Sequence, residues 1–475
     1  MISIHKKLEF WAGLKPNELA FVDGKKEITF AELNIHTLKV TAVLRELGIG
    51  SGDLVCTVLP AYLDWPITLA LQIIGATSFA KPSAASFDTY AEPKWLISLK
   101  ENSQFSIQNT VLVDQSFAER VNKAESNAPT KELHDSSKPV RLCSTSGTSG
   151  ETKYLPIYSS DMSSRLLSPS PVNFVGNGKF LNLMQFGAAQ SYFRAYRALY
   201  AGKTFFTSGF SDDGIFELLR KYDIDTIDGS PRQISLCMQN LKSAGQNLDS
   251  NFNLILGGSA PSPKMLEIIR AENKCSIFNS HGSAETGFIS MCDVTLENTP
   301  GLLIYPTSIV EVVDENDNEI SQNQIGVLRY KVPGACTSYF NNPEETKKSF
   351  KDGYFYSGDM GYKSDDGRLY ITGRSNEVIN LGGVKINPEQ VDALLFTEIG
   401  IQDAASFALD DDTGIPKLAV ALVVDHEFNE EAFLSAMKVK FTRAKIERVF
   451  KVNAVPRNPN GKILRRELNK KFSSK

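Results

Sequence analysis

The chain has 475 residues, of which 42% are hydrophobic and 22% are charged. Because single hydrophobic cores stop growing at roughly 250 to 300 residues, at least two domains are expected. The formal net charge of −4 gives no reason to expect a nucleic acid or an anionic membrane surface as a partner. The C-terminal end departs from this balance, since residues 438–475 contain 13 Lys or Arg and two acids, Glu447 and Glu467.

The six cysteines form no CxxC pair and have no histidine at metal-ligand spacing, which argues against a disulfide framework and a zinc site. The N-terminal sequence lacks the continuous apolar core of a signal peptide, and no run of about 18 apolar residues could span a bilayer. These features predict a protein of the reducing cytoplasm with no integral membrane segment.

From residue 29 to residue 80 the pattern predicts a helix, a short strand and a second helix, an alternation typical of a parallel sheet covered by helices. The same rhythm returns after residue 180. The segments FLNLMQF, KTFFTSGF, TIDGSP and FNLILGGS are predicted strands, and DDGIFELLRKY and PSPKMLEIIRAEN are predicted helices between them. Such a domain binds ligands at the carboxyl ends of its strands.

After about residue 301 short alternating strands and acidic turns predict an antiparallel β subdomain. Beyond Arg374 we expect a helix from Pro388, a strand around KLAVALVVD, a helix from Asn429, a strand at VFKVNAV and a basic terminal helix. The predicted fold class is therefore α/β: a large N-terminal domain of α/β sheets plus a β-rich subdomain, residues 1–375, followed by a small α+β C-terminal domain, residues 376–475.

The segment STSGTSGETK, residues 144–153, consists almost wholly of small hydroxylated residues and glycines and follows the apolar stretch VRLC. Such a loop can present backbone N–H groups and hydroxyls to a polyphosphate, and Lys153 adds positive charge at its end. Its spacing does not fit the GxxxxGK[ST] pattern. Taken alone, it fits a flexible Ser/Gly loop equally well.

This segment closely resembles the phosphate loop of the acyl-adenylate-forming superfamily, which includes acyl- and aryl-CoA synthetases, peptide-synthetase adenylation domains and beetle luciferases. Further matches follow in the order of that family, and the resemblance covers roughly residues 20–470. The matching segments are GGSAP at 257–261, HGSAETG at 281–287, YSGDMG at 356–361, ITGRSNEVINLGGVKINPEQVD at 371–392 and PRNPNGKILRREL at 456–468.

The resemblance implies that the chain binds ATP and Mg²⁺. Glu285 and Lys462 would be the catalytic residues, Glu285 as the Mg²⁺ ligand, while Asp359 and Arg374 would hold the ribose hydroxyls. The other nucleotide contacts would come from Thr145, Ser146, Gly147, Thr148, Ser149, Gly150 and Lys153 in the phosphate loop, from Gly258, Ser259 and Ala260, and from His281, Gly282, Ser283 and Ala284.

The chemistry of adenylation suits these residue types. A carboxylate oxygen attacks the α-phosphorus of ATP, so two anions approach each other and neutralising their charge is the main catalytic task. Lys462 would bridge the developing charge, and Mg²⁺ on Glu285 would shield the leaving pyrophosphate. Outside this context an aspartate after glycine, such as Asp359, is usually a turn residue, and a lysine in a basic tail is usually solvated.

Three residues depart from the family pattern. His281 replaces the tyrosine that stacks on adenine and offers less area for stacking. Ala284 replaces a threonine that touches the α-phosphate, and Thr152 replaces a proline before Lys153. These changes leave open a low-activity module that binds the adenylate without efficient turnover.

For the acid, the resemblance implies a pocket that includes Phe186, Gly187, Gly257 and Gly282. No acidic residue lies between residues 184 and 202, so an amino acid substrate would bury an unpaired ammonium group. A small carboxylic acid of the fatty or aromatic class is therefore favoured.

Individual residues of this region allow other interpretations. Phe186, Tyr192 and Phe193 are each more often core residues than pocket residues. Arg194 and Arg197 are expected on a surface helix, and pairing with a second carboxylate of the substrate is the alternative.

The resemblance also implies a mobile C-terminal domain that alternates between adenylation and thioester formation. Asn376 would be the hinge, and a short polar residue tolerates the dihedral change. The glycines Gly382 and Gly383 would leave backbone free for a pantetheine thiol. The expected activity is ATP-dependent, AMP-forming activation of the acid followed by thioester formation with coenzyme A. A stand-alone ligase that loads the phosphopantetheine of an acidic acyl-carrier protein, attracted by the basic C-terminal end, is the alternative.

Overall fold

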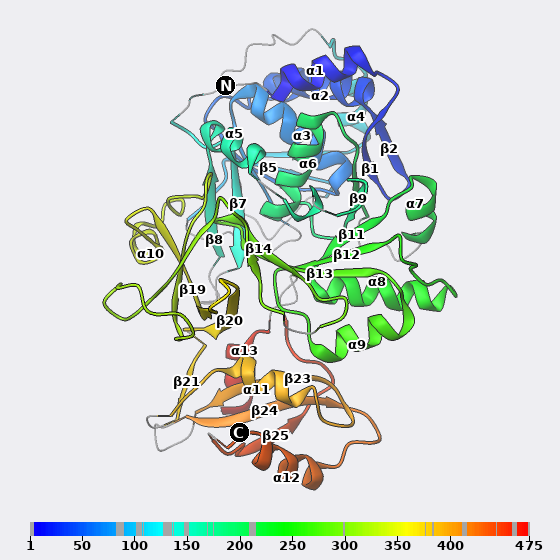
Figure 1. The fold of residues 1–475 in the computed structure, drawn as a ribbon. Helices are drawn as coiled ribbons and strands as arrows, with labels where there is room; N and C mark the ends of the chain where they lie inside the picture. The colour runs from blue at the N-terminus through cyan, green and yellow to red at the C-terminus, as the bar shows by residue number, and fades with distance from the viewer. Residues whose placement is uncertain are drawn as a thin grey trace. The chain divides into compact units, whose positions relative to one another are not determined.

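A computed structural model describes the chain at residues 4–81, 90–100, 107, 109–126, 135, 137–146, 152–168, 170–173, 175–208, 215–297, 300–375, 377–381, 384–410, 416–442, 444–457 and 463–473. It divides into two compact units (Figure 1). The first unit contains Met1–Gly229, Gly282–Phe288 and Val332–Phe355. The second contains Ser230–His281, Ile289–Lys331 and Tyr356–Lys475.

One sheet of the first unit is parallel except for a hairpin at its end. The helix α3 packs on it and is buried on every side, as expected for a helix that is apolar all round. The strands, in spatial order, are β6 (Asn109–Leu112), β5 (Trp95–Ser98), β3 (Leu54–Val58), β4 (Thr77–Ala80), β7 (Arg141–Ser146) and β8 (Thr152–Ile157). The helices of this region are α2 (Phe30–Glu46), α3 (Ala61–Ile74) and α4 (Gln115–Lys123).

A second group of strands in the first unit is parallel apart from the terminal pair β1 and β2. In order they are β11 (Thr226–Gly229), β9 (Phe180–Asn182), β10 (Phe205–Thr207), β1 (Leu19–Asp23) and β2 (Lys26–Thr29). Other elements here are α1 (Ile4–Leu14), α5 (Ser159–Leu167), a 3₁₀ turn (Pro171–Asn173), α6 (Ala189–Ala201), α7 (Ile215–Lys221), α10 (Pro343–Ser349) and β18 (Phe350–Lys351).

The second unit begins with β12 and β13, which run parallel, and continues into an antiparallel sheet in the order β16, β17, β19, with β20 on β19. Its elements up to residue 374 are α8 (Pro231–Ser243), β12 (Asn253–Gly257), α9 (Pro263–Glu272), β13 (Ser276–Ser283), β14 (Gly287–Asp293), β15 (Leu303–Ile304), β16 (Ile309–Val313), β17 (Gly326–Lys331), β19 (Tyr354–Lys363) and β20 (Leu369–Arg374).

The C-terminal part of the second unit has its own sheet, in which β24 lies between antiparallel β23 and parallel β25. Apolar clusters form on its two faces, one around Val391 and Phe433 and the other around Phe407 and Leu468. Its elements are β21 (Ile379–Leu381), β22 (Val384–Ile386), α11 (Pro388–Leu395), β23 (Ile401–Leu409), β24 (Lys417–Val424), α12 (Glu430–Lys440), β25 (Arg448–Lys451) and α13 (Arg465–Ser473).

Several helices begin where side chains satisfy the first free N–H groups. Thr29 and Glu32 form a capping box at the start of α2, and Ser230 with Gln233 does the same for α8. Ser262 caps α9 directly before Pro263 at the first helical position. These signals are readable in the sequence, and the predicted α/β class with its antiparallel subdomain is confirmed.

Among the described residues, no helix combines the length and the apolar character that crossing a membrane requires.

All six cysteines are buried free thiols.

The prediction that Arg194 lies on a surface helix is wrong. Its side chain on α6 is only 4% exposed and forms an ion pair with Asp228 of β11, which is fully buried. The periodicity of apolar residues in α6 did not predict the burial of Arg194, because its partner Asp228 lies in a later strand. Arg197 is half-buried and donates a hydrogen bond to the carbonyl oxygen of Arg165 at 2.8 Å.

The buried pair predicts a large loss of stability on one-sided removal. Arg194→Met leaves the carboxylate of Asp228 without a cation in the core, so the free energy of unfolding should fall by about 3 to 5 kcal/mol. Urea unfolding of the full-length protein measures this change.

The double variant Arg194→Met with Asp228→Asn is the matched control, because it removes both charges and should recover most of the loss. A single variant as stable as the wild type would contradict the pairing.

Candidate active site

Glu285 lies in a tight turn between β13 and β14, and a close approach of the two strands restricts the size of one residue beside it. A Cβ atom on Gly282 would lie 2.2 Å from the carbonyl oxygen of Gly287, so glycine is required there. The hydroxyls of Ser283 and Thr286 lie 3.0 Å apart, and Ser283 Oγ accepts the backbone N–H of Thr286 at 3.2 Å. These contacts fix the backbone on both sides of Glu285.

The carboxylate of Glu285 contacts a segment from much later in the chain. Tyr339 donates its hydroxyl to Glu285 Oε1 at 2.9 Å, and the Glu285 residue is 8% exposed. Burial, together with the charge and the hydrogen bond of Glu285, raises the pKa of Tyr339, so the tyrosine stays a donor at neutral pH. Tyr339 thus holds the side chain predicted to bind Mg²⁺.

Lys153 lies on the other side of the same tyrosine. Its Nζ atom is 5.0 Å from the centroid of the Tyr339 ring and 2.5 Å from Oε2 of Glu345, at the start of α10. Figure 1 shows α10 and the strand β8, which carries Lys153. The structure therefore brings together the predicted phosphate lysine and the predicted metal ligand through the segment that contains Tyr339 and Glu345.

Arg165 of α5 supports the Glu285 turn from within the protein. It donates Nη1 to the carbonyl oxygen of Ala284 at 2.9 Å, Nη2 to that of Glu285 at 2.5 Å, and Nε to that of Gly334 at 2.7 Å. Its guanidinium also lies 4.6 Å from the ring centroid of Phe193. A planar fork of five donors can satisfy several carbonyls at once, and it places a positive charge behind the turn.

The phosphate loop closes a β-hairpin. Thr145 of β7 pairs with Lys153 of β8, and Ser146 pairs with Thr152. Four predicted contacts, Gly147, Thr148, Ser149 and Gly150, lie outside the described residues, as does the side chain of Ser146.

In the second unit, Asp359 and Arg374 face each other on neighbouring antiparallel strands. They are register partners of β19 and β20, and Arg374 Nε lies 3.0 Å from Asp359 Oδ1. Ser357 donates its hydroxyl to Asp359 Oδ2 at 2.8 Å and accepts the backbone N–H of Asp359 at 3.0 Å. The carboxylate is thus held in one orientation by partners on both oxygens, and its remaining lone pairs can accept from a ribose diol.

Two chain segments approach each other closely at Gly373, directly before Arg374. Gly373 has φ of +142°, and a Cβ atom there would collide with the side-chain amide of Asn387, which donates to the carbonyl oxygen of Thr372. Glycine at this position is therefore needed for the C-terminal part to pack beside β20.

His281 belongs to the same cluster of the second unit. Its Nε2 atom lies 3.2 Å from the hydroxyl of Tyr330, a residue of β17 that is 1% exposed, and the ring centroids are 5.7 Å apart. Burial lowers the pKa of His281 and outweighs the opposing effect of Asp359. The ring is therefore neutral at pH 7 and can lie flat against an aromatic group without carrying charge.

The glycine-rich segment after β12 is exposed beyond its first residue. Gly257 is buried and pairs with Ser280 of β13, whereas Gly258, Ser259 and Ala260 are exposed. Gly258 has φ of +86° with no atom within 4 Å of a Cβ position.

The predicted pocket residues Phe186 and Gly187 lie at the carboxyl edge of the first parallel sheet. A Cβ atom on Gly187 would lie 3.2 Å from Cβ of Ala80, at the end of β4, and the next residue, Ala188, forms a bridge with Ser144 of β7. Phe186 packs edge-to-face against Trp65 at 5.7 Å between ring centroids, inside an aromatic core that also contains Phe21 and Phe205. Phe186 is thus buried among aromatic side chains, and Tyr192 is fully buried.

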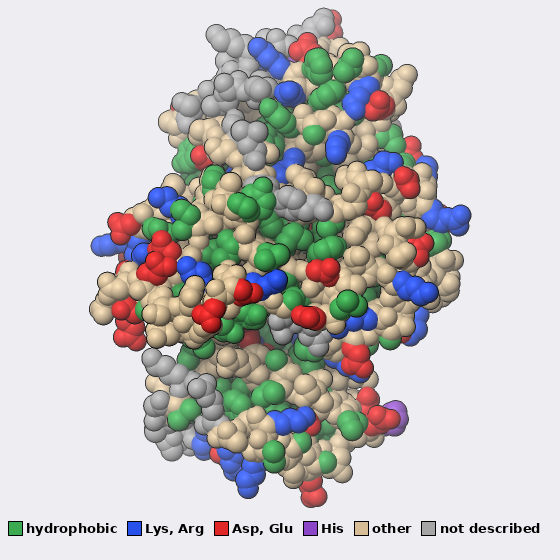
Figure 2. All heavy atoms as spheres, viewed as in Figure 1, with side chains coloured by type: hydrophobic (Ala, Val, Ile, Leu, Met, Phe, Trp, Pro, Cys, Tyr) green, Lys and Arg blue, Asp and Glu red, His purple; other side chains and the backbone are tan. Residues whose placement is uncertain are grey.

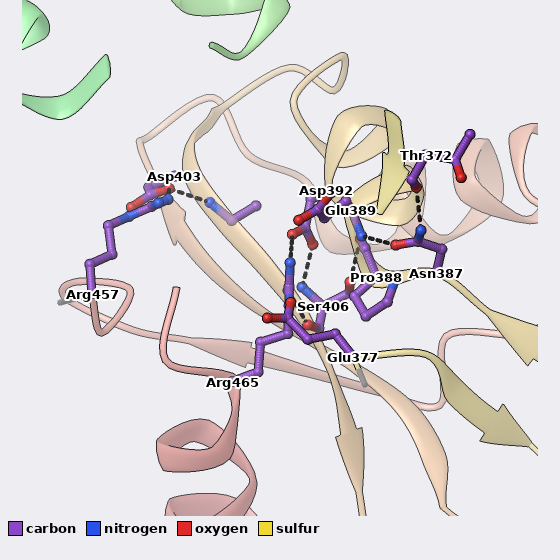
Figure 3. A network of polar contacts seen from close by, with 11 residues as sticks. Thr372, Glu377, Asn387, Pro388, Glu389, Asp392, Asp403, Ser406, Arg457 and Arg465 are labelled. Atoms are coloured by element: carbon purple, nitrogen blue, oxygen red, sulfur yellow. Dashed lines mark hydrogen bonds and ion pairs between the residues drawn. The ribbon is translucent and has the colours of Figure 1, made fainter. Parts of the chain in front are cut away.

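The residues predicted to carry the hinge, the thiol loop and the catalytic lysine, namely Asn376, Gly382, Gly383 and Lys462, lie outside the described residues. The surrounding residues form an ion-pair network (Figure 3). Arg465, near Lys462 in the chain, binds Asp392 at 2.6 Å and Glu377, which follows Asn376, at 3.2 Å. It also donates to the carbonyl oxygen of Ser406 at 2.5 Å. One guanidinium thus joins the chain next to the predicted hinge to the start of α13.

Sequence reasoning missed Arg165, Tyr339, Glu345 and Tyr330. Three of them contact a predicted site residue through a side chain, but they lie outside the quoted motifs. Arg165 acts on backbone carbonyls, which have no residue signature in a sequence. Only the position of Tyr339 shortly after an apolar strand and before the turn NNP gave a weak signal.

The family model described as AMP-binding enzyme matches residues 8–340. The chain belongs to the AMP-binding enzyme family, which confirms the resemblance drawn from its motifs.

Curated relatives match over nearly the whole chain. 4-Coumarate-CoA ligase 1 of Narcissus pseudonarcissus is 25% identical over 515 residues, which cover 95% of this chain and 90% of the relative. The 2-succinylbenzoate–CoA ligase of Bacillus cereus (strain Q1) is 22% identical over 96% of each chain.

Solved structures share the fold. ATP-bound MatB from Rhodopseudomonas palustris superimposes with a TM-score of 0.83 at 19% identity, over 98% of this chain and 99% of the other. The o-succinylbenzoate CoA synthetase MenE from Bacillus subtilis, in complex with the intermediate OSB-AMP, gives a TM-score of 0.81 at 19% identity over 97% of each chain.

The burial of His281 predicts a pH dependence of stability. Because its folded-state pKa lies below the usual value near 6.5, the unfolded chain takes up a proton at pH values where the folded chain does not. The stabilising contribution is complete above about pH 6.5 and is lost as the pH falls, by at most about 1.4 kcal/mol per pH unit. Chemical denaturation of the wild type and of His281→Gln at several pH values between 8 and 5 measures this slope.

Burial also lowers the pKa of His36, but this group is present in both proteins and cancels in the difference. A difference in stability that does not change with pH would contradict the assigned environment of His281.

Proposed function

We propose that this chain is an AMP-forming acid–thiol ligase. It binds ATP, activates a carboxylic acid as its acyl-adenylate with release of pyrophosphate, and transfers the acyl group to the thiol of coenzyme A with release of AMP. The observation that carries the proposal is the meeting of Lys153, Tyr339 and Glu285 in the first unit, because it places a cation for phosphates beside a carboxylate for a metal ion.

In the first step a carboxylate oxygen bonds to the α-phosphorus and the bond to the bridging oxygen of pyrophosphate breaks. Lys153 binds the phosphates that leave, and Lys462 offsets the charge that gathers on the acyl and α-phosphate oxygens. Arg374 and Ser357 orient the carboxylate of Asp359, which accepts hydrogen bonds from the ribose hydroxyls and so fixes the position of the nucleotide. Arg165 keeps the Glu285 turn in position and adds positive charge behind it.

The donor set suits Mg²⁺ bound mainly by the nucleotide. Within the described parts of the chain, no group of three or more His, Cys, Asp or Glu side chains could hold a metal ion by itself. Mg²⁺ commonly takes one or two protein carboxylates and fills its remaining positions with phosphate oxygens and water. Glu285 would supply the protein carboxylate, and the bound ion would neutralise charge on the phosphates.

A fatty or aromatic acid remains the proposed substrate class. The curated relatives named above act on 4-coumarate and 2-succinylbenzoate, which supports the aromatic side of this proposal. The segment that begins at Phe186 has no acid for an ammonium group up to the end of α6, and its only charged side chains are Arg194 and Arg197. Because Arg194 already pairs with Asp228, a second substrate carboxylate finds no unneutralised partner in it.

Coenzyme A is the favoured acceptor because much of the basic C-terminal end is neutralised within the protein. Acids of the same unit pair with Lys440, Lys445, Lys451, Arg457 and Arg465. Acidic and basic side chains are likewise interspersed among the described residues on the face in Figure 2. Such a surface attracts an acidic carrier protein less strongly than the residue count suggests. We further propose that residues 376–475 move about Asn376 between the two steps, in a protein of the cytoplasm.

The role of Lys462 predicts a loss of adenylation in one variant. Lys462→Ala should slow acid-dependent exchange of labelled pyrophosphate into ATP by about 100- to 1,000-fold, because charge stabilisation in the transition state is lost. Circular dichroism and thermal unfolding should be unchanged.

Lys438→Ala is the matched control, since Lys438 is exposed and lies in the same basic end. Equal exchange rates in the Lys462→Ala variant and the wild type would contradict the assigned role.

The acceptor is decided by the rate of AMP release. Free coenzyme A should accelerate AMP release from the enzyme loaded with ATP and acid, whereas a holo acyl-carrier protein at the same concentration should not. Acceleration by the carrier protein alone would contradict coenzyme A as the acceptor and would favour the ligase that loads a carrier protein.

A further inference from the structure

The amine of Lys153 is bound by a carboxylate of the protein itself. Glu345 Oε2 lies 2.5 Å from Lys153 Nζ, and the two side chains are 29% and 16% exposed. Glu345 Oε1 accepts from Lys348 at 3.0 Å, and the backbone N–H of Glu345 donates to Asn342 Oδ1 at 3.1 Å. The carboxylate is therefore fixed from several directions, and its pKa is lowered by its hydrogen bonds with Lys153 and Lys348.

The segment that carries Glu345 also contacts the metal-binding turn. Tyr339 donates to Glu285 at 2.9 Å, and its own backbone N–H donates to Thr346 Oγ1 at 2.9 Å, next to Glu345. One short stretch of chain thus presents Tyr339 to Glu285 and Glu345 to Lys153. Loss of the ion pair between Glu345 and Lys153 would therefore change the residues proposed to bind phosphates.

We propose that Glu345 is the resident counter-ion of Lys153 and sets the affinity of the site for ATP and pyrophosphate. This inference rests on the proposed role of Lys153 in binding phosphates. A phosphate oxygen and the Glu345 carboxylate compete for the same ammonium group, so the ion pair has to be broken before a phosphate can take its place. Glu345 therefore weakens ground-state binding of both polyphosphates, which keeps pyrophosphate from remaining on the enzyme after the first step.

Glu344 provides an internal comparison. It carries the same charge on the neighbouring position of α10 and is exposed, and among the described residues it forms no ion pair with Lys153. A variant of Glu344 removes one negative charge from the same helix without releasing the lysine.

The test is the affinity of the full-length protein for ATP and, separately, for pyrophosphate, measured by isothermal titration calorimetry at fixed ionic strength. Glu345→Gln should bind both about fivefold more tightly than the wild type, the factor that corresponds to about 1 kcal/mol for a partly exposed ion pair. Glu344→Gln should bind as the wild type does. Unchanged or weaker binding by Glu345→Gln would overturn the proposal.

A double-mutant cycle with Lys153→Met separates competition for the lysine from a general change of charge. In the Lys153→Met background, Glu345→Gln should no longer tighten binding, and tightening of the same size there would overturn the proposal. Glu345→Ala serves as a second variant of the same contact, and thermal unfolding confirms that each variant is folded.

The outcomes for Glu345 and for the proposed function are distinguishable. The counter-ion requires only polyphosphate binding, whereas the ligase requires acid-dependent exchange by the wild type. A wild type that binds ATP but shows no exchange with any acid would contradict the ligase and leave the binding comparison fully interpretable.

Discussion

Two anions have to meet when a carboxylate attacks the α-phosphorus of ATP, and this is the constraint that the proposed reaction sets for the charged groups of the site. The first unit contains Lys153 at the end of a β-hairpin and Arg165 behind a turn, both positive, and Glu285, the carboxylate proposed to bind a metal ion. Tyr339 joins the lysine to the carboxylate without adding charge. These contacts bring together segments that are distant in the sequence.

The second unit contains the residues proposed to hold the nucleoside. Asp359 and Arg374 are opposite each other because two antiparallel strands place them in register, and Ser357 fixes the remaining carboxylate oxygen. Gly373 allows Asn387 to approach the backbone directly before Arg374. The C-terminal part therefore packs beside the arginine assigned to the ribose, and Arg465 binds Glu377 and Asp392, which follow this junction.

Local signals were sufficient to predict several helices and strands. The predicted helix PSPKMLEIIRAEN and the one that follows Thr29 correspond to α9 and α2, and each begins at a capping side chain. Strand β23 was missed because residues on both of its faces are buried. Its sequence therefore shows no simple alternation of apolar and polar residues. Arg194 was misplaced for a related reason: its burial depends on Asp228, and periodicity within one helix contains no information about a partner in a distant strand.

The site was predictable to the extent that its residues stand in motifs. Asp359, Arg374, Glu285 and Lys153 could be named from the sequence, but Tyr339 and Glu345, which contact Glu285 and Lys153, could not. The amino-acid sequence does not distinguish the roles of Glu344 and Glu345. Only the geometry of α10 determines that Glu345 faces Lys153. The carbonyl oxygens bound by Arg165 belong to the backbone and leave no trace in residue identity.

The central claim is that an oxygen of the acid becomes bonded to the α-phosphorus of ATP. It is tested most directly by turnover of an acid labelled with ¹⁸O in its carboxylate, with ATP, Mg²⁺ and coenzyme A, followed by mass spectrometry of the nucleotide and phosphate products. Adenylation predicts AMP that carries one ¹⁸O atom, because the bridging oxygen leaves with AMP when the thiol attacks the acyl carbon. Label in inorganic phosphate with formation of ADP, or turnover that leaves AMP unlabelled, would contradict it.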